Sequence, residues 1–178
     1  MTGLISTVLA ENSMNKYDIK NTDLLRRSIT DTRSLLLTRK IQQLKVSDLI
    51  SVLNLSRSTF FRFFGNMNII FELVISEELE YCYELIGRNL LAALDNPHLI
   101  AELNLLRAIY VRKNCILYNY YKSILSLPKR YAPLIQAITA KEQQLYVNIL
   151  SRQMNYISND YSRIKLSPLF QNRPFNPS

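Results

Sequence analysis

The sequence predicts an all-α protein, and three observations support this fold class. Only 3 of the 178 residues are glycine, which is few for the tight hairpin turns of an all-β chain. Apolar residues recur at i, i+3 and i+4 over long stretches, the spacing of one helix face. The composition, 48% hydrophobic and 20% charged, is that of a globular chain. The elements below are therefore all expected to be helices.

The N-terminal sequence predicts a flexible segment followed by a first helix. Residues 1–21 show no sustained period, so we expect them to be flexible. Met14 lies within them and is an alternative translation start to Met1. The first helix should begin at Asn21 or Thr22, which can cap free N–H groups, and end near Gln43. Its apolar positions are Leu25, Ile29, Leu35, Leu36 and Ile41.

Two short helices are predicted next, over residues 46–53 and 57–64. Asn54 tolerates the left-handed backbone of a turn between them, and Ser56 can cap the second helix. Gly65 is expected to end that helix. Residues 22–66 would then form an N-terminal three-helix domain.

Longer helices are expected in residues 67–160. Asn66 can cap a helix over 67–94, and Asn96 followed by Pro97 signals the start of a helix that ends near Arg112. The apolar stripe of the helix over 67–94 consists of Ile70, Leu73, Val74, Tyr81, Leu85 and Ile86.

The C-terminal part should contain two more helices, over 114–127 and 133–158, separated by Pro128. The last helix carries Leu134, Ile138, Leu145 and Ile149, from which we predict a homodimer interface made with the helix before it. Residues 161–178 are polar and contain prolines, so we expect an extended or disordered tail.

Basic residues are concentrated near the N-terminus. The net charge of the chain is +8. Residues 22–64 contain eight basic and three acidic residues, whereas residues 67–178 contain twelve basic and nine acidic residues. Such a local excess attracts polyanions such as nucleic acid.

Several other classes of protein are disfavoured. Cys82 and Cys115 have no Cys or His partner nearby, so we expect buried free thiols and neither a disulfide framework nor a zinc site. No stretch approaches ~20 uninterrupted apolar residues, and the first residues lack the basic start of a signal peptide. We expect a cytoplasmic protein with no membrane partner, metal or cofactor.

The stretch from Val46 to Gly65 has the organisation of a helix-turn-helix, in which the first helix braces a second that presents polar side chains to a DNA groove. Arg can donate two hydrogen bonds to a guanine edge, and Ser or Thr can bond bases or phosphates. Phe60 and Phe64 are four apart and should face the core. The candidate DNA-binding residues are Lys45, Ser47, Arg57, Ser58, Thr59, Phe61, Arg62 and Phe63.

Over residues 22–75 the sequence resembles the DNA-binding domain of the TetR family of transcriptional regulators. The family pattern is Thr-Val-x-Asp-Ile-Ala, then Gly-Val-Ser, then Thr-Leu-Tyr-x-x-Phe. The resemblance implies a homodimer that places the helix from Arg57 to Phe63 of each subunit in successive major grooves of a near-palindromic operator, most often as a repressor. The matching residues are Val46, Asp48, Leu49, Leu55, Ser56, Thr59, Phe60 and Phe64.

Three positions depart from that pattern. Asn54 replaces the turn glycine, Phe61 replaces a tyrosine, and Met67 replaces a lysine that opens the fourth helix. In the family this tyrosine and this lysine contact the DNA backbone, so two phosphate contacts are missing here. Lys45 stands where the family prefers threonine and can replace one of them.

Residues 67–160 resemble the regulatory and dimerisation domain of the family in helix count and length. That likeness implies a small ligand whose binding tilts the fourth helix and changes the spacing of the two reading helices. Tyrosines have an aromatic body and a polar tip, which suits an amphipathic or aromatic ligand but equally suits a helical core or a dimer interface. The candidate ligand-binding residues are Tyr81, Tyr110, Tyr118 and Tyr121.

Catalysis is not expected. His98 is the only histidine, there is no glycine-rich phosphate loop, and Glu77, Glu78, Glu80 and Glu84 have the spacing of a solvated helix face. The rival interpretation is a helical scaffold protein with a degenerate helix-turn-helix, which acts through protein contacts alone.

Overall fold

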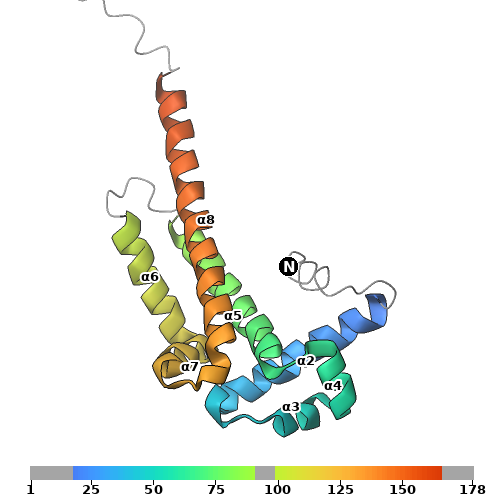
Figure 1. The fold of residues 1–178 in the computed structure, drawn as a ribbon. Coiled ribbons are helices and arrows are strands. Elements are labelled where there is room, and N and C mark those ends of the chain that lie inside the picture. The colour runs from blue at the N-terminus through green and yellow to red at the C-terminus, as the bar shows by residue number, and fades with distance from the viewer. Residues whose placement is uncertain (1–17, 91–98, 166–178) are drawn as a thin grey trace, which may run out of the picture. The chain divides into compact units, whose positions relative to one another are not determined.

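The computed structural model describes residues 18–90 and 99–165, and all the regular elements in these ranges are helices (Figure 1). The predicted all-α class is confirmed. Asn96 and Pro97, where a helix was expected to start, lie outside the described residues. His98 lies outside them as well. The chain divides into two compact units, which we call the first unit, Met1–Val74 with Leu125–Leu134, and the second unit, Ile75–Ile124 with Ile135–Ser178.

The first unit begins with helix α2, Asp18–Thr38, and a short 3-10 helix, Ile41–Gln43. Two predictions were wrong here: residues 18–21 are helical instead of part of a flexible lead-in, and α2 ends before Gln43. The Arg39 amide closes the last turn on the Leu35 carbonyl, after which Lys40 is extended. Ile41 still reaches the core, as predicted, because the 3-10 turn directs it inward.

Helices α3, Val46–Leu53, and α4, Arg57–Phe64, have the predicted bounds. Asn54 ends α3 in the left-handed conformation, with φ 50° and ψ 44°. The Ser56 hydroxyl oxygen accepts a hydrogen bond of 3.1 Å from the Thr59 amide at the start of α4. Gly65 follows α4 at φ 65°, a conformation that favours glycine. These local signals position α4 beside α2 and α3 (Figure 1).

A segment distant in sequence completes the first unit. Tyr131, within the 3-10 helix Lys129–Tyr131, is buried, and its hydroxyl donates to the Ile41 carbonyl at 3.1 Å. Its ring centroid lies 6.5 Å from that of Phe71, near the start of α5. The Asn68 amide nitrogen donates to the Arg130 carbonyl at 2.9 Å. Residues 125–134 are therefore fixed on the first unit by both packing and hydrogen bonds.

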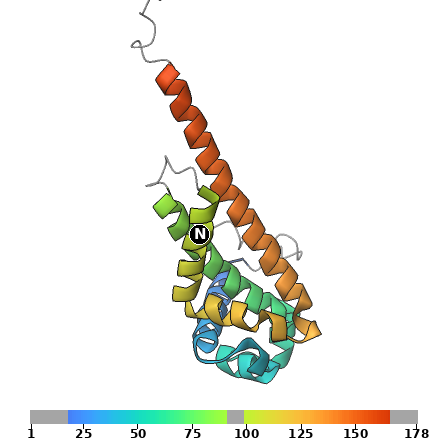
Figure 2. The same ribbon diagram turned by 90° about the vertical axis from the view of Figure 1, so that its left-hand side faces the viewer.

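The second unit is a bundle built around α5, which spans Met67–Leu90 and enters this unit at Ile75. The two views show α6, Leu99–Lys113, and α8, Ala132–Lys165, running along α5, with α8 projecting beyond the ends of both (Figures 1 and 2). Helix α7, Cys115–Ser123, is capped by the Asn114 side chain, which accepts from the Leu117 amide.

The C-terminal ends of two predicted helices, α7 and α8, differ from the prediction. Helix α7 gives way to a 3-10 turn at Ile124–Ser126, and α8 continues past 158 to Lys165. Residues 161–165 are consequently helical, and the extended tail predicted for them was wrong; residues 166–178 lie outside the described part. The end predicted for α5 at Leu94 likewise lies outside it.

Two expectations about side-chain burial were also wrong. Tyr81, placed in the apolar stripe of α5, is 59% exposed. Cys115 is exposed, whereas Cys82 is buried as predicted. The pKa of the Cys82 thiol is raised to about 11, first by burial and then by the Glu142 carboxylate, so this thiol is protonated at neutral pH.

The apolar residues expected at a homodimer interface are used inside the chain instead. Leu134, Ile138 and Ile149 of α8 are buried within the single protomer, and Leu145 is half-buried. Of the four predicted interface residues, only Leu145 keeps surface that a partner could contact. Over residues 18–90 and 99–165, none of the helices has the length and apolar character needed to cross a membrane.

Candidate nucleic-acid interface

Helix α4 has one face fixed in the core and one face open to solvent. Phe60 and Phe64 are buried, with ring centroids 5.4 Å apart. Arg57, Ser58 and Arg62 are exposed on the other side. A short helix held by two aromatic anchors therefore presents two guanidinium groups and a hydroxyl outward, which is the arrangement needed to hydrogen-bond base edges.

Aromatic side chains support both arginines of α4. The Arg57 guanidinium carbon lies 5.6 Å from the ring centroid of Phe61, and that of Arg62 lies 5.8 Å from the centroid of Phe63. Cation–π contacts of this kind restrict the guanidinium while leaving its N–H donors free to bond. Phe61 is exposed and Phe63 half-buried, so both border the open face of α4.

The predicted serine and threonine donors are partly engaged within the turn. The Ser56 hydroxyl lies 2.9 Å from the Ser58 hydroxyl and 2.8 Å from the Thr59 hydroxyl. Thr59 is half-buried, whereas Ser47 on α3 is exposed. The structure thus exposes Arg57, Ser58 and Arg62 on α4 and exposes Ser47 separately on α3.

Lys45 stands at the start of α3 with its side chain exposed. Its backbone amide donates to Asp48 Oδ2 at 2.8 Å, and Arg39 Nη1 lies 3.6 Å from Asp48 Oδ1. The Asp48 carboxylate therefore secures the start of α3 and is compensated by Arg39, which leaves the Lys45 ammonium as an exposed charge.

A cavity of about 380 Å³ lies beside Lys45 in the first unit. It is lined by two basic side chains, Lys45 and Arg130, and no acidic side chain lines it. The other lining residues are Leu44, Val46, Phe61, Asn66, Met67, Asn68 and Tyr131. Three positions singled out in the sequence, Lys45, Phe61 and Met67, thus meet at one place, together with an arginine that the sequence analysis did not select.

The first unit is strongly basic. Its described residues, 18–74 and 125–134, contain eleven basic and five acidic side chains, a net charge of +6. A surface of this sign attracts a polyanion at long range and loses that attraction as salt is added.

The second unit contains a polar cluster centred on Glu142 of α8. Glu142 Oε1 accepts from Arg107 Nε at 2.6 Å and from the Tyr83 hydroxyl at 3.1 Å, and Glu142 Oε2 accepts from the Tyr121 hydroxyl at 2.6 Å. The Arg107 guanidinium carbon also lies 5.1 Å from the Tyr121 ring centroid. Both carboxylate oxygens are satisfied by side chains from three other helices.

Burial and this carboxylate raise the pKa values of the neighbouring phenols. The pKa of Tyr120 is raised to about 12, first by burial and then by the charge of Glu142. Burial is also the first cause of the raised pKa values of Tyr83 and Tyr121, followed by Glu142. Hydrogen bonding to Glu142 raises the pKa of Arg107. The phenols of Tyr83, Tyr120 and Tyr121 are therefore neutral at neutral pH.

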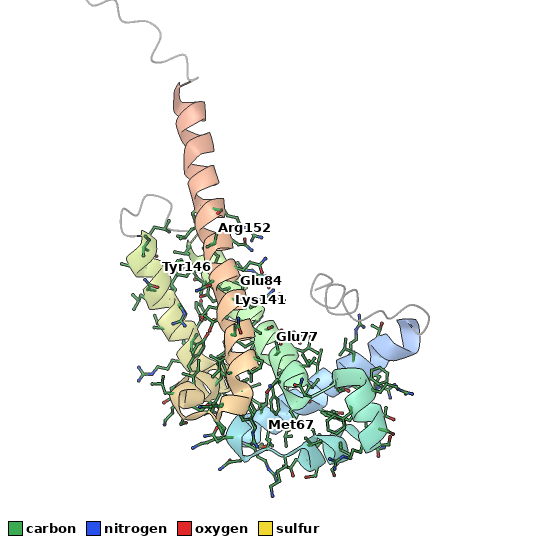
Figure 3. All side chains as sticks on the ribbon, viewed as in Figure 1. Met67, Glu77, Glu84, Lys141, Tyr146 and Arg152 are labelled. Carbon is green, nitrogen blue, oxygen red and sulfur yellow. The ribbon has the colours of Figure 1, made fainter. Side chains whose placement is uncertain are left out.

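A cavity of about 390 Å³ adjoins this cluster. Arg107 donates from Nε to Glu142, and its guanidinium carries further N–H donors on the two terminal nitrogens. Tyr146, on the α6 side of α8 in Figure 3, forms part of the wall. The lining residues are Tyr83, Asn104, Arg107, Thr139, Glu142, Gln143, Tyr146 and Val147.

The four tyrosines predicted to bind a ligand are not brought together. Tyr81 and Tyr118 are exposed on α5 and α7, and the Tyr110 hydroxyl accepts from the Asn89 amide at 2.7 Å. Tyr121 is the one that reaches the Glu142 cluster, and none of the four lines the cavity described above. Tyr83 and Tyr146 line it instead.

The glutamates of α5 are not simply a solvated face. Glu80 pairs with Lys141 of α8 at 2.6 Å, Glu78 accepts from the Asn114 side chain at 2.6 Å, and Glu84 pairs with Arg88. Figure 3 labels Lys141 between Glu77 and Glu84 along the boundary of α5 and α8. The contacts of Glu80 and Glu78 bind α5 to its neighbours in the second unit, whereas the Glu84–Arg88 pair lies within α5. Over the described ranges, no group of His, Cys, Asp or Glu side chains is placed to hold a metal ion.

Comparison of the chain with models of protein families, with curated proteins and with solved structures gave no match.

Proposed function

We propose that this protein is a sequence-specific DNA-binding transcriptional repressor, and that α3 and α4 are the two helices of a helix-turn-helix. The observation that carries the proposal is the division of α4 into a buried face, Phe60 and Phe64, and an exposed face with Arg57, Ser58 and Arg62. Helix α4 would enter the major groove while the start of α3, with Lys45, lies against the backbone. The net charge of +6 on the first unit and the TetR-like pattern of residues 22–75 support the same role.

We further propose that the protein acts as a homodimer on a near-palindromic operator, because two reading helices match two half-sites only under two-fold symmetry. Helix α6 is apolar around most of its circumference, which is typical of a helix covered on several sides. Ile100, Leu105 and Ile109 of α6 are nevertheless exposed, as is Val147 of α8. A second copy covering these side chains would remove them from water.

The function is tested by binding to duplex DNA from the region flanking its own gene. We expect affinity to fall steeply as salt is raised, since each protein–phosphate contact releases about one counterion. Footprinting should show two protected half-sites about one helical turn apart. Analytical ultracentrifugation of the complex should show two protein chains bound to each duplex. An absence of binding, or binding that salt does not change, would favour the rival scaffold role.

A second part of the proposal concerns release from DNA. We propose that the cavity beside Arg107 binds a small planar aromatic molecule with an oxygen acceptor, and that this binding weakens DNA affinity. The terminal nitrogens of Arg107 supply donors to that acceptor, while Tyr83 and Tyr146 supply aromatic walls. Glu142 orients Arg107 through Nε and has both oxygens occupied.

Arg107→Lys should weaken binding of such a molecule about tenfold, because an ammonium keeps the charge but loses the planar pair of donors. Isothermal titration calorimetry with 4-hydroxybenzoate and with 4-hydroxybenzamide measures this affinity. Comparison of the two compounds shows whether the site prefers a carboxylate or a neutral oxygen acceptor. Arg112→Lys is the matched control, since Arg112 is exposed on the same helix. Equal binding of either compound to both variants would show that Arg107 is not the anchor.

A further inference from the structure

We infer that Arg130 is part of the DNA interface and holds one backbone phosphate jointly with Lys45. Arg130 falls in the regulatory domain predicted from sequence, residues 67–160, but the structure places it in the first unit. This inference rests on the proposed DNA-binding function and extends it beyond α3 and α4. It is carried by the cavity of about 380 Å³ in the first unit, where Arg130 and Lys45 are the two charged side chains of the wall.

The position of Arg130 is fixed by its neighbours. The Asn68 amide nitrogen donates to the Arg130 carbonyl at 2.9 Å, and the adjacent Tyr131 is buried with its hydroxyl on the Ile41 carbonyl. The Arg130 guanidinium carbon lies 5.0 Å from the Tyr131 ring centroid, and Nη2 makes a long contact of 3.4 Å with the Tyr131 hydroxyl. The backbone is therefore anchored while the guanidinium stays exposed.

The chemistry of the cavity fits a phosphodiester. Two positive side chains face it without a lining carboxylate, so an anion is favoured. A guanidinium presents a planar fork of donors that matches phosphate oxygens, and Lys45 adds a point charge beside it. Phe61, on the exposed side of α4, also lines this cavity. An anion bound here therefore adjoins the helix proposed to read bases, where the DNA backbone would run.

The test uses the full chain and a fluorescein-labelled duplex of mixed sequence, titrated by anisotropy at several salt concentrations. Arg130→Ala should weaken binding about tenfold and make the slope of log affinity against log salt shallower by about 1 per bound chain. Lys129→Ala is the matched control. It removes the same charge from the neighbouring residue, whose side chain does not line the cavity. Arg130→Lys should retain most of the salt slope.

Met67→Lys provides a rescue, since Met67 lines the same cavity. In the Arg130→Ala background, the new ammonium should restore most of the lost salt slope. In the wild-type background it should steepen the slope less, because the new ammonium and Arg130 would contact the same phosphate. Equal losses in Arg130→Ala and Lys129→Ala, or no loss in Arg130→Ala, would overturn the inference while leaving DNA binding intact. A wild-type chain that shows no salt-dependent binding would overturn both the inference and the proposed function.

Discussion

Replacement of Glu142 by alanine should lower the free energy of unfolding by about 2 to 3 kcal/mol. The change leaves Arg107, Tyr83 and Tyr121 without their shared acceptor, and loss of one partner of a partly buried ion pair is costly because the other charge remains desolvated. We place the effect below that of a fully buried pair because the Arg107 side chain is 33% exposed and can turn toward water.

Urea unfolding followed by far-ultraviolet circular dichroism measures this effect. Glu142→Gln keeps the volume and one acceptor oxygen, so it should cost less than Glu142→Ala. Glu84→Ala is the matched control, because Glu84 forms an exposed pair with Arg88 on α5 that should contribute less than about 1 kcal/mol. A loss in Glu142→Ala no greater than that in Glu84→Ala would contradict a stabilising role for the cluster.

The same cluster predicts how stability changes at alkaline pH. The folded-state pKa values of Tyr83, Tyr120 and Tyr121 lie above the ordinary value of 10.0, mainly because of burial. Their contribution to the free energy of unfolding is therefore complete below about pH 10. It is lost as the pH rises toward their folded-state pKa values; that of Tyr120 is about 12. Phenolate absorbance during titration should show these tyrosines ionising after the exposed ones.

Arg57→Ala should reduce specific DNA binding by about 1 to 3 kcal/mol and relax the base preference at one position of each half-site. Arg57 is the first residue of α4, is exposed, and rests on the Phe61 ring, so its guanidinium is directed out of the helix that would enter the groove. We expect Arg62→Ala to act in the same way. Lys45→Ala should instead weaken binding to all sequences alike, because phosphate contacts carry no sequence information.

Selection of bound sequences from a randomised duplex pool separates the two effects. Arg112→Ala controls for the loss of an exposed arginine elsewhere, and it should leave both the affinity and the selected sequence unchanged. The assignment of reading and bracing helices would be wrong if Lys45→Ala changed the selected sequence while Arg57→Ala left it untouched.

The sequence by itself determined the features that depend on neighbouring residues. The bounds of α3 and α4 follow from Ser56, which caps α4, from Asn54 in the left-handed turn and from Gly65. Phe60 and Phe64 were predicted in the core because a spacing of four places both on one helix face. Such signals act within one or two turns of helix, so they can be read without knowing the rest of the fold.

Only the tertiary structure decided which distant side chains meet. Arg130 and Lys45 line one cavity although they are 85 residues apart, and Glu142 accepts a hydrogen bond from Tyr83, 59 residues away. Tyr81 fits the helical period of α5 but is exposed, whereas Leu79 and Cys82 of the same helix are buried. Periodicity gives the spacing of a buried face, but the neighbouring helices determine which arc of α5 is covered, because burial depends on contacts between segments far apart in the chain.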